Sequence, residues 1–155
     1  MWTVIEDLRL HKLYIPPSLD SLLETFLYLF SQNKPSILII DDDTSILRAF
    51  ARIFERKGYS VTVATKGTEA IEKLNGNHFD VALIDFCLPD MEGTQLIPLI
   101  QLTSPSTVKI ILTGKALGRG SIEGVDALVG KPIHPERLLS LIDSELKNRN
   151  METFH

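Results

Sequence analysis

Cysteine is nearly absent from the 155-residue sequence, which contains only Cys87. A single thiol cannot form an internal disulfide, so nothing indicates an oxidising compartment, and the reducing cytoplasm is the expected location. A membrane-spanning run is also lacking, because the longest apolar run near the N-terminus, Phe26–Phe30, is far too short to cross a bilayer. Glu6 and Asp7 stand where a secretory signal would carry positive charge. We therefore expect a cytoplasmic protein without a targeting segment.

Positive charge is also scarce. The chain has 16 Lys and Arg residues against 20 Asp and Glu residues, for a formal net charge of -4. Such a balance provides no general attraction for nucleic acid or an anionic membrane, so we expect direct binding to neither. Hydrophobic residues make up 44% and charged residues 23%, which is typical of a globular protein. The length fits one ordinary domain.

What the sequence does contain is a regular alternation from Ser36 onward. Short apolar runs, rich in Val and Ile, alternate with segments of helical periodicity, which is typical of strand–helix units around a parallel sheet. Such runs suit strands that are covered on both faces. The expected strands are Ile37–Ile40, Ser60–Ala64, Val81–Ile84, Val108–Leu112 and Ala127–Val129. The predicted fold class is therefore α/β, with a doubly wound sheet of five parallel strands.

Helices are expected between these strands. The predicted helices are Ser45–Lys57, Thr68–Leu74, a third that begins after Gly93 with Thr94 as its N-cap, and a last one that follows Pro135. Pro98 is tolerated because it lies in a first turn. Between Thr113 and Asp126 four glycines crowd the place of a fourth helix, which we predict to be short or irregular.

Residues 1–34 do not fit the alternation. Ser21–Glu24 has the pattern of a capping box and follows Pro16-Pro17. Apolar residues then recur at helical spacing, at Leu19, Leu22, Leu23, Phe26, Leu27 and Phe30. An amphipathic helix is predicted, and two roles stay open: it packs back on the domain, or residues 18–32 form a homodimer or partner interface. The expected organisation is an extension over 1–34, the α/β domain over 35–147 and a frayed tail over 148–155.

Polar residues stand at the carboxyl ends of four predicted strands. Asp41–Asp43 follow the first strand, Asp85 the third, Thr113 the fourth and Lys131 the fifth. In a parallel sheet with helices on both faces, these ends line one shared crevice. Clustered carboxylates raise one another's pKa, and a divalent cation relieves the conflict. Oxygen ligands of this kind favour Mg²⁺.

This constellation suggests phosphoryl transfer. Asp85 would attack phosphorus in line, while Mg²⁺ and the Lys131 ammonium neutralise the developing charge. Taken alone, Thr113 and Lys131 would be unremarkable residues, and Asp43 is expected only to cap the following helix. Their order after the first, third, fourth and fifth strands argues against coincidence. Cys87 is not expected to act as a nucleophile, because no His lies nearby in the sequence to activate it.

Four segments carry a family resemblance: Ile37–Asp43, Val81–Gly93, Ile110–Gly114 and Lys131-Pro132. Together they resemble the response-regulator receiver (CheY-like) family of two-component signalling, from residue 35 to about 147. The resemblance implies a flavodoxin-like fold with strand order 2-1-3-4-5. It also implies a phosphoprotein that takes its phosphoryl group from a sensor histidine kinase or phosphotransfer protein. Such a domain phosphorylates and dephosphorylates itself and is not an enzyme in the ordinary sense.

The resemblance also assigns roles to individual residues. Asp85 would be the phosphoacceptor, and Mg²⁺ would be held by Asp41, Asp42, the Asp85 carboxylate and the backbone carbonyl of Cys87. Lys131 would contact the phosphoryl group, and the Thr113 hydroxyl would swing toward it. The side chains of Cys87 and Lys115 would flank the path of the hydrolytic water and tune the lifetime of the phosphate.

Two features depart from the family pattern. The segment between Thr113 and Lys131 is about one turn short, and Leu128 occupies the switch position where an aromatic residue commonly lies. We therefore expect the output to pass through another surface, for which the N-terminal helix is the first candidate. No further domain follows Lys147 in this sequence, so we expect a downstream protein partner or a dimer to carry the signal.

Two other readings stay open. Asp41–Ser45 resembles the nucleophile motif of haloacid-dehalogenase-like phosphatases, although the acidic pair required after the lysine could only be Asp143 and Glu145, inside a predicted helix. The alternative is a pseudo-receiver, an interaction module that keeps the fold and does not cycle phosphate.

Overall fold

The computed structural model describes residues 17–32, 34–115 and 122–152. The chain divides into two units, residues 1–34 and 35–155, and each is considered by itself. In the first unit, α2 spans Pro17–Gln32. Ser21 lies inside this helix, so the prediction that it caps the helix is wrong. Proline is favoured in a first turn because its missing N–H would have no partner there, which explains the earlier start.

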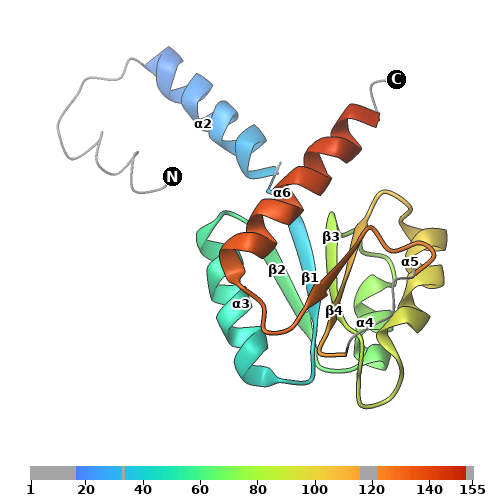
Figure 1. The fold of residues 1–155 in the computed structure, drawn as a ribbon. Helices are drawn as coiled ribbons and strands as arrows, with labels where there is room; N and C mark the ends of the chain where they lie inside the picture. Colours follow the sequence, from blue (N-terminus) through green and yellow to red (C-terminus); the bar gives the residue numbers. More distant parts are fainter. Residues whose placement is uncertain (1–16, 33, 116–121, 153–155) are drawn as a thin grey trace. The chain divides into compact units, whose positions relative to one another are not determined.

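The second unit is built on five parallel strands in the order β2-β1-β3-β4-β5 (Figure 1), which confirms the predicted topology. The strands are β1 Ser36–Ile40, β2 Ser60–Ala64, β3 Val81–Asp85, β4 Val108–Thr113 and β5 Ala127–Gly130. The strands β3, β4 and β5 each end one residue later than predicted. As a result, Asp85 and Thr113 are the last residues of β3 and β4.

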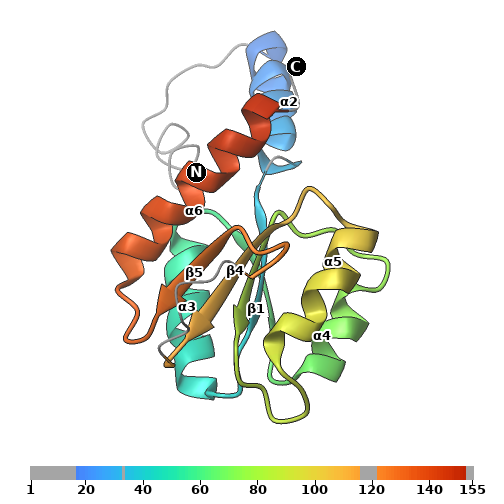
Figure 2. The same ribbon diagram turned by 45° about the vertical axis from the view of Figure 1, so that its right-hand side comes forward.

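Helices cover both faces of this sheet. They are α3 Thr44–Arg56, α4 Gly67–Leu74, the 3-10 turn η1 Gly93–Leu96, α5 Ile97–Thr103 and α6 Pro135–Glu152. Figures 1 and 2 show α3 and α6 on one face and α4 and α5 on the other. On β1, Ile37 and Ile39 belong to the core under α3 and α6, whereas Leu38 and Ile40 belong to the core under α4 and α5. All four are fully buried, as expected for a strand covered on both faces.

Two predicted helix starts had different outcomes. Asp43 caps α3 as predicted, since its Oδ1 accepts the backbone N–H groups of Ser45 at 2.9 Å and Ile46 at 3.2 Å. The prediction of Thr94 as an N-cap is wrong, because η1 already begins at Gly93 and Glu92 caps it. The backbone of Gly93 packs so closely on the carbonyl of Asp85 that even a Cβ would collide with it. This non-local contact fixes the start of the turn.

The described residues between β4 and β5, 114–115 and 122–126, form bends and turns and contain no helix. The rest of the predicted fourth helix, residues 116–121, lies outside the described residues. At the other end of the domain, α6 continues to Glu152, so residues 148–152 are helical instead of a frayed tail. Within the described part of the chain, no helix has the length and apolar character needed to span a membrane.

Candidate functional site

Three carboxylates meet at the carboxyl edge of the sheet. Asp41 and Asp42 follow β1, and Asp85 ends the neighbouring strand β3, where Ile40 pairs with Ile84. One oxygen from each carboxylate can be chosen so that all three lie within 4.8 Å of one another. Asp41 is fully buried, Asp85 is 6% exposed and Asp42 faces solvent. The structure therefore brings together the acidic residues that the sequence singled out.

Lys131 joins this cluster from the end of β5. Its Nζ lies 3.1 Å from Oδ2 of Asp41 and 3.3 Å from Oδ1 of Asp85. Its backbone N–H donates to the carbonyl of Thr113 at 2.7 Å, which fixes the lysine beside the end of β4. Burial would lower the pKa of Lys131, but the hydrogen bond and charge of Asp41, together with Asp85, raise it overall. The ammonium is therefore held in its charged form between two carboxylates.

The cluster remains short of positive charge. Burial and the nearby Asp41 carboxylate raise the pKa of Asp85, and Lys131 and the backbone N–H of Cys87 offset this only in part. An all-oxygen cluster with one ammonium for three carboxylates suits a hard divalent cation. Asp41, Asp42 and Asp85 therefore have the donor chemistry to hold Mg²⁺.

Thr113 lies at the end of β4 with its side chain 6% exposed. Its Oγ1 accepts the backbone N–H of Lys115 at 3.0 Å and donates to the Lys115 carbonyl at 3.3 Å. The Lys115 ammonium lies 6.0 Å from the ring centroid of Phe86, the residue that follows Asp85. The sequence pattern predicts no role for Phe86, because a contact between two loops far apart in the chain leaves no local signal.

Two further positions named from the sequence lie near the edge of the sheet. Cys87 has an exposed thiol, and its backbone forms an isolated bridge with Glu92. The role of its carbonyl as a metal ligand stays a prediction. Leu128 is 39% exposed on β5 and pairs with Ile111, two residues before Thr113.

Asp90 is a site-supporting residue that the sequence did not reveal. Its carboxylate accepts the backbone N–H groups of Gly67 at 2.8 Å and Thr68 at 2.9 Å, and so caps α4 from the loop after β3. The hydrogen bonds from Thr68 and Gly67 lower the pKa of Asp90. Because the residue at the N-cap, Lys66, makes no side-chain capping bond, a cap from elsewhere could have been expected.

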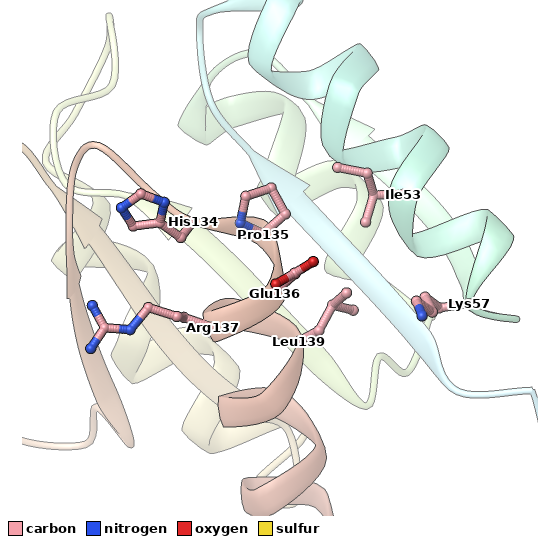
Figure 3. Close-up of a pocket in the computed structure, with 7 residues that line it drawn as sticks. All are labelled: Ile53, Lys57, His134, Pro135, Glu136, Arg137 and Leu139. Carbon is pink, nitrogen blue, oxygen red and sulfur yellow. The ribbon is translucent and has the colours of Figure 1, made fainter.

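A separate hollow lies between the C-terminal half of α3 and the start of α6 (Figure 3). Its volume is 720 Å³, and it is lined by Ile53, Lys57, His134, Pro135, Glu136, Arg137 and Leu139. None of these residues belongs to the acidic cluster, and the predicted chemistry does not involve them.

The strand order and the cluster at the carboxyl edge define a class of protein: a flavodoxin-like doubly wound domain whose ligand is expected at that edge. Residues 37–143 match the response regulator receiver domain. The uncharacterized transcriptional regulatory protein YkoG of Bacillus subtilis (strain 168) is 30% identical over 124 residues, which cover 77% of this chain and 54% of YkoG. The chain therefore belongs to the response regulator receiver family of two-component systems.

Solved structures agree with this assignment. A CheY-like receiver domain protein from Methanospirillum hungatei JF-1 is 37% identical, with a TM-score of 0.70 over 77% of this chain and 99% of that one. A response regulator from Burkholderia pseudomallei is 26% identical, with a TM-score of 0.64 over 77% of this chain and 73% of that one. That protein contains a phosphorylated aspartic acid, a calcium ion and citrate. The chain spans between about a quarter and about half of the length of the first curated relatives it matches.

Proposed function

We propose that this receiver accepts a phosphoryl group on Asp85 from a histidine kinase or phosphotransfer protein, in a Mg²⁺-dependent reaction in the cytoplasm. The observation that carries the proposal is that the Asp85 carboxylate shares the Lys131 ammonium with Asp41 at the end of β3. Family membership and the oxygen-only cluster support the same reaction.

In the proposed reaction, a carboxylate oxygen of Asp85 attacks phosphorus in line, and the bond from phosphorus to the donor's leaving group breaks. Asp41, Asp42 and Asp85 would hold Mg²⁺ together with the carbonyl of Cys87. The cation supplies charge neutralisation for the phosphoryl oxygens. Lys131 is positioned to neutralise the same charge, and Thr113 would donate its hydroxyl hydrogen to a phosphoryl oxygen.

The signal would then reach a downstream protein or a second copy of the chain. Residues 18–32 are the proposed interface for a homodimer, since Leu19 and Leu22 on α2 are 49% and 65% exposed. Large apolar side chains exposed in this way commonly mark interaction surfaces.

Incubation with Mg²⁺ and acetyl phosphate tests the proposed function. We expect an adduct of about 80 Da, the nominal mass of a phosphoryl group, which is stable in acid and labile in base. It should be absent from Asp85→Asn and after removal of Mg²⁺ with EDTA. Asp43→Asn is the matched control, because this neighbouring residue caps α3 and asparagine caps equally well.

A wild-type chain that forms no adduct would refute this function. A pseudo-receiver would then be favoured by the exposed Leu128 in the expected switch position and by the absence of a helix from residues 114–115 and 122–126. An adduct on Asp41, with sustained hydrolysis of phosphate esters, would instead point to phosphatase chemistry.

A further inference from the structure

The Thr113 hydroxyl is already engaged by the residue two positions further along the chain. It accepts a hydrogen bond from Lys115 N and donates to Lys115 O, at 3.0 and 3.3 Å. A hydroxyl has a single hydrogen to donate. To donate it to a phosphoryl oxygen on Asp85, Thr113 must give up its bond to the Lys115 carbonyl. The conformation of Lys115 therefore sets how readily Thr113 can respond.

The side chain of Lys115 contacts Phe86, in the loop that follows β3. Its Nζ lies 6.0 Å from the ring centroid of Phe86, at the limit of a cation–π contact. The Phe86 backbone is fixed at both ends: its N–H donates to Leu112 O at 2.8 Å, and its carbonyl accepts from Gly93 N at 2.8 Å. The ring also packs against the core beneath α4 and α5. The exposed Lys115 side chain therefore has a weak contact with a ring whose own position is fixed.

These contacts connect the loop after β3 with the loop after β4, and the proposed function needs a residue from each. Phe86 directly follows the acceptor Asp85, and Lys115 holds the hydroxyl of Thr113. At the usual aromatic switch position this chain has Leu128, which is 39% exposed. Phe86 is an aromatic residue next to Asp85 in the chain, and its ring is in contact with the Lys115 ammonium.

We propose that Lys115 is a positioning residue: seated on Phe86, it holds the 113–115 turn and the Thr113 hydroxyl in the unphosphorylated arrangement. A phosphoryl group on Asp85 carries about -1.5 to -2 charges next to Phe86 and attracts the ammonium more strongly than the ring does. The ammonium leaves the ring, the turn loosens and Thr113 becomes free to donate to the phosphoryl group. This release step rests on the proposed function of Asp85.

The positioning role can be tested without any phosphodonor. The measurement is the NMR position of the Thr113 amide and γ-methyl signals in the full chain. Phe86→Leu and Lys115→Gln should shift these signals in the same direction, and the double variant should shift them no further, because each substitution removes the same contact. Lys115→Arg keeps a cation over the ring and should resemble the wild type. Shifts that add in the double variant, or Thr113 signals that do not move in Lys115→Gln, would overturn the role.

The release step is tested with Mg²⁺ and acetyl phosphate. Phe86→Leu keeps the ammonium but removes its support, so Asp85 should be phosphorylated about two- to fivefold faster than in the wild type, the factor that an exposed cation–π contact represents. An equal or slower rate contradicts the release step. A wild-type chain that forms no adduct refutes the proposed function and the release step with it, whereas the donor-free NMR comparison decides the positioning role by itself.

Discussion

At the scale of single residues, the acidic cluster brings like charges together at the edge of the sheet. Two buried carboxylates, Asp41 and Asp85, share the ammonium of Lys131. Burial and Asp41 raise the pKa of Asp85, so the folded chain binds a proton there more readily than the unfolded chain does. The contribution of Asp85 to stability therefore falls as pH rises from the ordinary aspartate pKa through the raised one. Ionisation of Asp85 at neutral pH therefore lowers the stability of the folded chain.

Removing that charge should stabilise the protein. In EDTA at pH 7, Asp85→Asn should raise the free energy of unfolding by about 1 kcal/mol, the usual size for one substitution. Urea denaturation followed by circular dichroism measures the change. Mg²⁺ should stabilise the wild type more than the variant, because the variant has lost a ligand. The electrostatic argument is contradicted if Asp85→Asn is less stable than the wild type in EDTA.

At the scale of elements, the loop after β3 is tied to the start of α4 by Asp90. Its pKa is lowered by these hydrogen bonds, so its stabilising effect is present above the ordinary aspartate pKa and is lost as pH falls through the lowered one. Asp90→Ala should lower the melting temperature by a few degrees at pH 7 and have less effect in acid. Asp90→Asn should lose less, because asparagine keeps one acceptor oxygen. Equal melting of Asp90→Ala and wild type at pH 7 would show that the cap contributes nothing.

Most of the elements and the acidic cluster could be predicted from the sequence. Strand and helix positions follow from local periodicity, and the acidic cluster follows from the strand ends, so Asp41, Asp42, Asp85 and Lys131 were predictable. The start of η1 depends on the fit of Gly93 against the Asp85 carbonyl. The roles of Phe86 and Asp90 depend on partners more than 20 residues away. Such contacts leave no periodic signal in the chain.

At the scale of the whole molecule, the proposed chemistry lies in the receiver unit and α2 is the proposed means of association. Leu22→Glu, on a side chain 65% exposed, should reduce dimer formation about tenfold or more by placing a charge in an apolar interface. Analytical ultracentrifugation of the full chain measures the change. Ser21→Glu is the matched control. Ser21 is also exposed, and this substitution adds the same charge one position away. Identical sedimentation of the two variants and the wild type would contradict a dimer through residues 18–32.

The lone exposed thiol also makes this protein convenient for spectroscopy. Because Cys87 is the only cysteine in the chain, one maleimide dye can be attached at a defined position without first removing others. That position lies two residues beyond Asp85, on the loop that packs against the end of β3. A dye there would test the proposed binding of Mg²⁺ and the proposed phosphorylation of Asp85 in real time, with no substitution elsewhere in the chain.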